Sequence, residues 1–310
     1  MNVQRRDFLL FVTLVVVVAA AMPVWGQAGA PTASGAQNGA SIPDVSGVWL
    51  HPSIPGFEPL SSGPTSVVNK SRLRTGPQAG TGNINQLVGD YTNPILKPEA
   101  AEVLKQHGEI MLSGNGYPDP RNQCQPQGVP YVFTSGGMQL LQQPDKITIL
   151  YDYDHQVRHV RMNQPHPAQV TPSWYGDSVG HYEGDTLVID TVGFKVGPFA
   201  MVDRFGTPHT SALHVVERYR LLDYDAAKEG MERDAHENQI AMGTRDETVR
   251  GKYLQLQFTV EDEGVFTMPW SATITYGRPL IEWPEFVCAE NTQWFPGTEA
   301  TLPRADKPDF

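Results

Sequence analysis

The chain has 310 residues and a formal net charge of −11 at pH 7. An acidic surface repels phosphate groups, which argues against nucleic acid or an anionic membrane as a partner. Its 26 prolines and 29 glycines favour many turns over long helices.

The N-terminus has the three parts of an export signal. Arg5-Arg6 precede an apolar stretch from about Phe8 to Val24, and the small residues Gly26-Gln27-Ala28 follow. This order predicts a twin-arginine signal peptide over residues 1–28. The alternative is an uncleaved anchor, because the apolar run approaches the ~18 residues that span a bilayer. Either way we expect a periplasmic or secreted protein, without stable membrane insertion if the signal is cleaved.

Residues 29–43 are mostly Gly, Ala, Ser and Pro, a composition typical of a disordered linker. We expect a single β-rich domain over residues 44–310. One helix is predicted near residues 97–108, where Pro98 stands at the start, helix formers follow and Gly108 stands at the end.

From Met138 onward, apolar residues recur at every second position, as in half-buried strands. Asp154-His155 is a predicted hairpin tip, and Glu183-Gly184-Asp185 is the predicted turn of a hairpin over Ser178–Phe194. Further strands are predicted at Ser211–Leu222, Tyr253–Val260 and Ser271–Tyr276. These lengths predict a mainly β fold, either an antiparallel barrel or a sandwich. Gly47-Val48-Trp49 resembles the G-x-W of lipocalin-like (calycin) barrels.

Cys124 and Cys288 are the only two cysteines. In an oxidising compartment we expect them to form a disulfide. Two isolated buried thiols are the alternative. Neither lies beside a second cysteine, which argues against a thiolate metal site.

The densest group of chemically active residues lies between Asp203 and Tyr219. Asp203, His209, His214 and Glu217 are the candidate catalytic residues, at a junction between a loop and a strand. Alternation predicts that Glu217 points inward, where desolvation raises the pKa of a carboxyl group. A structural pair of Glu217 with Arg161 is the alternative interpretation.

The candidate substrate-binding residues are His166, Trp174, Tyr175, Arg161, Arg218 and Asp190. Asp190 is predicted to be a second inward carboxylate, and the arginines are candidate anion stabilisers. His166, Trp174 and Tyr175 belong to a loop rich in proline and aromatic residues, suited to covering an apolar pocket, with core packing as the alternative for the two aromatic residues.

The leading expectation is that the protein uses no cofactor. The chain lacks G-x-G-x-x-G and P-loop patterns, so a nucleotide cofactor is not predicted. His209, His214 and His166 are the candidate ligands if a metal is present.

Several motifs, taken in order, resemble a family of exported bacterial proteins usually called hypothetical proteins. The resemblance covers about residues 44–295 and rests on Cys124–Pro130 (CxPxGxP), Pro165–Pro167, Pro172–Gly180, Glu183–Val188, Gly206–Thr210, Leu213–Tyr219, Pro269–Trp270 and Cys288–Asn291. It brings no assigned reaction, but it strengthens the expected disulfide. The family tends to have Gly-Arg where this chain has Gln164-Pro165.

These residues predict a periplasmic enzyme that acts on a small, partly apolar molecule, aromatic or terpenoid-like, by acid–base chemistry of histidine and carboxylate. The reaction would be that of a lyase, isomerase or hydrolase. One alternative is a lipocalin-like carrier of an apolar ligand. Another is a metal-dependent oxidoreductase.

Overall fold

The chain divides into two units, residues 1–39 and 40–310. The computed structural model describes residues 42–76, 80, 82–83, 85–153, 156–238, 250–279 and 283, all in the second unit. The predicted signal peptide, most of the predicted linker and the predicted hairpin tip Asp154-His155 therefore lie outside the described residues.

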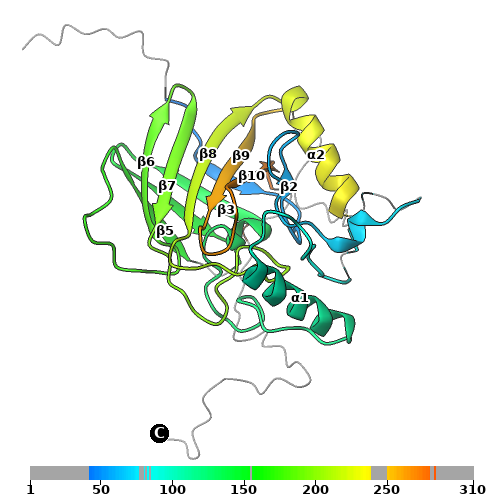
Figure 1. Cartoon of the computed structure of the whole chain (residues 1–310). Helices are drawn as coiled ribbons and strands as arrows, with labels where there is room; N and C mark the ends of the chain where they lie inside the picture. Colours follow the sequence, from blue (N-terminus) through cyan, green and yellow to red (C-terminus); the bar gives the residue numbers. More distant parts are fainter. Residues whose placement is uncertain are drawn as a thin grey trace, which may run out of the picture. The chain divides into compact units, whose positions relative to one another are not determined.

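In the described part of the chain, ten strands form one curled sheet (Figure 1). The strands are β1 (Gly47–Leu50), β2 (Glu58–Pro59), β3 (Gly137–Gln142), β4 (Lys146–Tyr151), β5 (Val157–Met162), β6 (Asp177–Glu183), β7 (Thr186–Val192), β8 (His214–Leu222), β9 (Tyr253–Glu261) and β10 (Trp270–Tyr276). Their order across the sheet is β1-β3-β4-β5-β6-β7-β8-β9-β10-β2. The mainly β, barrel-like fold expected from the alternating pattern is confirmed.

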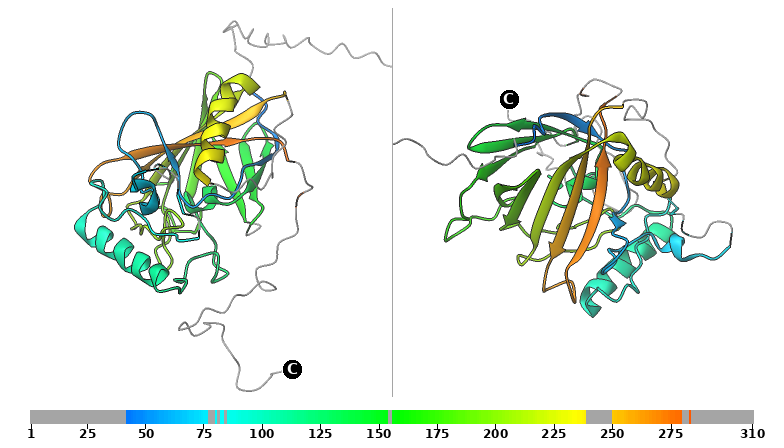
Figure 2. Two further views of the ribbon diagram at one scale, coloured as in Figure 1. Left: turned by 90° about the vertical axis from the view of Figure 1, so that its right-hand side faces the viewer. Right: turned by 90° about the horizontal axis from the view of Figure 1, so that it is seen from above.

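The curl brings strands from opposite ends of the sheet order together. Leu50 and Gly277 exchange two backbone hydrogen bonds, of 2.9 and 2.8 Å, which link the end of β1 to the residue after β10. The right-hand view of Figure 2 shows the sheet curving round on itself. The result is a half-barrel with one concave face.

All neighbouring strands are antiparallel except β5 and β6, which run parallel. Parallel neighbours need a crossover connection that leaves the sheet and returns to its starting end. Residues 163–176 provide this connection. The single parallel pair departs from the expected antiparallel barrel, and it places the proline- and aromatic-rich loop over the sheet.

Alternate side chains of the strands fill the concave face. Ile147, Ile149 and Tyr151 are buried there, as the two-residue period predicts. Trp49 is fully buried, and its indole N–H donates to the carbonyl of Val45 at 2.9 Å. The guanidinium of Arg278 lies 3.8 Å from the centre of the Trp49 ring. The tryptophan of the G-x-W pattern is therefore a core residue at the start of the sheet.

Two α-helices occur in the described residues. Helix α1 (Pro98–Leu112) begins at the predicted proline but continues past Gly108. A side chain at Gly108 would lie 2.9 Å from Cγ1 of Val88, so this glycine permits close packing and does not end the helix. Helix α2 (Tyr224–Asn238) was not predicted. In its first turns only Ala227 and Met231 are buried, so the apolar stripe that indicates a helix is weak.

Neither helix in the described ranges combines the length and the apolar character that crossing a membrane requires.

Candidate acid–base site

A row of ionisable side chains crosses the convex face of the sheet, on the side away from the core. The register places Arg161 opposite Val179, Val179 opposite Asp190, and Asp190 opposite Val216. His214 lies directly opposite Glu261 at the start of β8. Side chains of opposed residues on one face lie close together. The sheet itself therefore brings these groups to one place.

These groups form one continuous hydrogen-bonded chain. Arg161 holds Asp177 with two hydrogen bonds, of 2.6 and 2.9 Å. His166 connects two carboxylates, with its Nδ1 at 2.7 Å from Asp177 and its Nε2 at 2.9 Å from Asp190. The other oxygen of Asp190 lies 3.1 Å from Nε2 of His214. Asp190 therefore bridges two imidazole rings.

The groups in this hydrogen-bonded chain shift one another's pKa values toward the charged forms. A hydrogen bond from Arg161 holds the pKa of Asp177 below its usual value, and hydrogen bonds from His214 and His166 lower the pKa of Asp190. Conversely, the hydrogen bond to Asp190 raises the pKa of His214. Because ionised carboxylates only accept hydrogen bonds, Nε2 of His214 is the donor to Asp190.

The other nitrogen of His214 has a longer contact. Its Nδ1 lies 3.4 Å from an oxygen of Glu261, whose side chain is 50% exposed. That contact is longer than an ordinary N–H···O bond. An imidazole oriented by a carboxylate through one nitrogen, with only a long contact at its other nitrogen, can serve as a general base.

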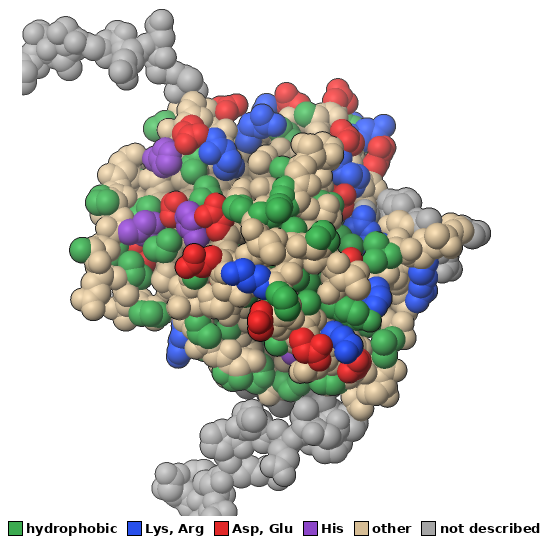
Figure 3. Space-filling view, in the orientation of Figure 1, with side chains coloured by type: hydrophobic (Ala, Val, Ile, Leu, Met, Phe, Trp, Pro, Cys, Tyr) green, Lys and Arg blue, Asp and Glu red, His purple; other side chains and the backbone are tan. Residues whose placement is uncertain are grey.

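The surroundings of the site are part apolar. Val179 and Val216 flank Asp190 on either side in the register, and both are half-buried. Figure 3 shows histidine side chains beside acidic and hydrophobic ones on the part of the surface where β6 and β7 lie in Figure 1. A small molecule with an apolar part has both kinds of surface within reach here.

Glu217 points inward, as alternation predicts, but its partner is Arg158 and not Arg161. Arg158 donates to both oxygens of Glu217, at 2.6 and 3.1 Å, and both residues are buried. The remaining N–H groups of Arg158 reach Ser178, Thr191 and Tyr151. A carboxylate paired and saturated in this way fits the structural interpretation.

The prediction that Asp190 is a second inward carboxylate is wrong. Thr191 takes the inward position on β7 and hydrogen-bonds Arg158, whereas Asp190 lies on the convex face with a side chain that is 36% exposed. Leu187, Val188 and Ile189 are all buried, so both faces of this strand are apolar. The apolar neighbours of Asp190 therefore did not identify its face.

Asp203 and His209 lie in the loop before β8, and in the part of the chain that the structure describes their hydrogen bonds go to this loop and not to Asp190. One oxygen of Asp203 accepts the amides of Phe205 and Thr207, at 2.9 and 3.1 Å. Burial raises the pKa of Asp203 to about 6. Burial lowers the pKa of His209, whose Nδ1 lies 3.1 Å from the carbonyl of Thr210. Both residues support the loop.

The remaining predicted binding residues are dispersed. Tyr175 is buried and stacks on Tyr151 at 5.4 Å between ring centres, which fits the core-packing alternative. Trp174 is half-buried, with the ammonium of Lys195 4.9 Å from its ring centre. Arg218 pairs with Glu183 on the exposed surface.

Of the three candidate metal ligands, His166 and His214 share Asp190, whereas His209 is directed elsewhere. Among the described residues, no group of three or more potential ligands is arranged to hold a metal ion.

Cys124 is the sole cysteine in the described ranges, and it is not a free thiol. The expected partner, Cys288, lies outside those ranges. The disulfide therefore stays a prediction.

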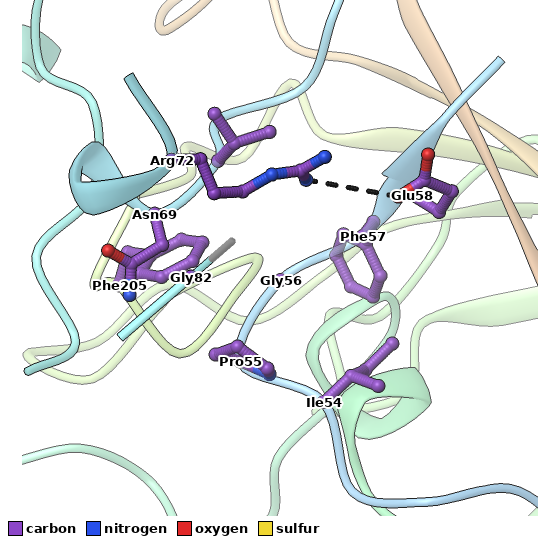
Figure 4. Close-up of a pocket in the computed structure, with 10 residues that line it drawn as sticks. Ile54, Pro55, Gly56, Phe57, Glu58, Asn69, Arg72, Gly82 and Phe205 are labelled. Carbon is purple, nitrogen blue, oxygen red and sulfur yellow. Dashed lines mark ion pairs between the residues drawn. The ribbon is translucent and has the colours of Figure 1, made fainter. Parts of the chain in front are cut away.

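A small cavity near β2 is too narrow for an organic substrate. It has a volume of about 20 Å³ and is lined in part by Phe57, Phe205 and Asn69. Figure 4 shows the ion pair of Arg72 with Glu58 across it, at 3.8 Å. This volume suits about one water molecule.

Sequence reasoning missed Asp177, which lies between Arg161 and His166, and Glu261, which lies beyond His214 at the other end. Asp177 belongs to one of the ordered motifs, which was a usable signal. Glu261 becomes recognisable only when β9 is paired with β8. No protein-family model matches this chain, and comparison with curated proteins and with solved structures gave no match either.

Proposed function

We propose that this protein is an exported enzyme that performs acid–base catalysis on a small, partly apolar molecule, with His214 as the proton carrier. The observation that supports this proposal is the bridging position of Asp190, which fixes Nε2 of His214 while Nδ1 has only a 3.4 Å contact, with the half-exposed Glu261. The signal-like sequence at residues 1–28 supports the export route and a periplasmic or secreted location.

In the proposed mechanism, neutral His214 keeps its proton on Nε2, donated to Asp190, so that Nδ1 has the free electron pair. Nδ1 accepts a proton from the substrate, and Asp190 stabilises the imidazolium that forms. The same nitrogen then returns the proton to the product or to water. Such a cycle suits a lyase, an isomerase or a hydrolase.

The other residues of the hydrogen-bonded chain position Asp190 and His214. His166 holds the second oxygen of Asp190, Asp177 holds His166, and Arg161 holds Asp177. Because each group has a fixed partner, the Asp190 carboxylate keeps its direction without side-chain reorganisation. Removal of His166 therefore weakens catalysis indirectly, by loosening Asp190.

A screen of small esters, lactones and hydroxylated terpenoid or aromatic compounds, followed by mass spectrometry, tests the proposal. On any compound converted, His214→Ala is expected to lower kcat by about 10²–10⁴-fold, the usual contribution of a general base. His181→Ala is the matched control, because His181 lies on the same convex face but, among the described residues, pairs with Glu183 and not with Asp190. His181→Ala is expected to retain full activity.

Full activity of His214→Ala on a confirmed substrate would overturn the proposal. Binding without any conversion, unaffected by His214→Ala, would instead favour the carrier alternative.

A further inference from the structure

A second, larger cavity is lined by residues between 69 and 112, which are far in sequence from the residues of the acid–base site. Its volume is about 360 Å³, within the range of roughly 300–1,000 Å³ typical of small-molecule sites. Three segments line it: the 3₁₀ helix η1 (Lys70–Leu73) with Arg74, residues 86–91, and the end of α1.

The walls of this cavity are held in place by the backbone. Lys70 donates its amide to the carbonyl of Val88 at 2.7 Å, and Asn69 pairs with Gly89 as an antiparallel bridge. The buried side chain of Asn69 caps η1 by accepting the amide of Ser71, and it donates to the carbonyls of Asn83 and Gln86 at 3.0 Å each. Two of the three segments that line the cavity are therefore joined to each other by hydrogen bonds.

Its lining is amphipathic and carries positive charge only. Leu73 and Leu112 form exposed apolar walls, with 55% and 60% of their surfaces accessible, and Val88 and Tyr91 add to the apolar surface. Lys70 and Arg74 also line it, and no acidic residue does. Exposed leucines around one concavity are typical of a binding surface.

Lys70 and Arg74 have no anionic partner among the described residues. The ammonium of Lys70 lies 3.5 Å from the centre of the Tyr91 ring, and within the described residues neither Lys70 nor Arg74 forms an ion pair. Arg72, which lies between them in sequence, pairs with Glu58 across the smaller cavity of Figure 4. In a chain with a net charge of −11, two unpaired cations over an apolar surface favour an anion as the occupant.

We propose that this cavity binds a small amphipathic organic anion, an apolar body that carries one carboxylate or a comparable acid group. The apolar body lies against Leu73, Val88 and Leu112, and the acid group lies between Lys70 and Arg74. This site is separate from the Asp190–His214 chain and does not depend on the function proposed for it.

Two fluorescent probes with one apolar scaffold test this proposal on the purified protein. Anilinonaphthalene sulfonate carries the anionic group, and phenylnaphthylamine is its neutral counterpart. We expect one bound molecule of the sulfonate per chain, an affinity at least about tenfold higher than that of the neutral probe, and weaker binding at high salt.

Variants locate the binding. Lys70→Ala with Arg74→Ala is expected to weaken sulfonate binding by about tenfold or more while leaving the neutral probe unaffected. Lys105→Ala is the matched control, since it removes a half-exposed cation of α1 that pairs with Glu102 and Glu109 outside the cavity. Thermal unfolding of each variant verifies that the fold is retained. Equal affinity for both probes, or sulfonate binding that survives the double substitution, would refute the proposal.

Discussion

Replacement of Glu217 by alanine is expected to lower the free energy of unfolding by about 3–5 kcal/mol, the usual effect of removing one partner from a buried ion pair. Arg158 would stay buried, with two of its N–H groups unpaired and no counter-charge, and Tyr219 would lose its 2.8 Å hydrogen bond to the carboxylate. The total stability of a domain is about 5–15 kcal/mol, so the loss is a large part of it.

Urea unfolding followed by tryptophan fluorescence measures this effect. The matched control is Glu183→Ala, which breaks the exposed pair with Arg218 on the other face of β8 and is expected to leave the unfolding midpoint unchanged. The double variant Arg158→Met with Glu217→Leu is expected to be more stable than Glu217→Ala, because it leaves no buried charge. A loss below about 1 kcal/mol for Glu217→Ala, or a double variant as unstable as the single one, would refute a structural role for the pair.

Three further outcomes follow from particular contacts. Asp190→Asn is expected to lower the pKa of His214, because the hydrogen bond to Asp190 is the main cause that raises it; an unchanged NMR titration of this imidazole would contradict the geometry. The pKa of Asp203 is raised from 3.8 to about 6, so the folded chain binds this proton more tightly and loses stability as pH rises between these values. Asp203→Asn is therefore expected to become more stable than the wild type as pH passes 6, and a constant difference between pH 4 and 8 would count against it. Gly108→Ala, ordinarily favourable in a helix, is expected to lower the melting temperature, because its methyl group would lie 2.9 Å from Val88.

The fold was largely predictable because the two-residue period is local. Ile147, Ile149 and Tyr151 identify their buried face without knowledge of any neighbour. The hairpin turn at Gly184 was predictable for the same reason, since glycine there adopts a φ of 62°. Helix α2 was missed because its apolar stripe is short and Gly230 interrupts it. That glycine lets the helix approach β10, where a side chain would clash with Thr275.

The partners of the ionisable residues were less predictable, because they depend on strand pairing. Glu217 was placed inward correctly, yet Arg161 was chosen as its partner in place of Arg158. The alternation of β5 contained the answer: Arg158 shares its face with the buried Val160 and Met162, and Arg161 lies on the other face. Assigning each arginine to a face of β5 would have identified Arg158 as the partner of Glu217 from the sequence alone.

The acid–base chain exists because one pair of strands is parallel. An antiparallel hairpin between β5 and β6 would need only a few residues and would leave the convex face bare. The parallel pairing requires residues 163–176 to cross that face, and His166 is carried to a position between Asp177 of β6 and Asp190 of β7. His166 therefore connects carboxylates that the sheet alone would leave two residues apart in register. The departure from an all-antiparallel barrel and the candidate site have the same structural origin.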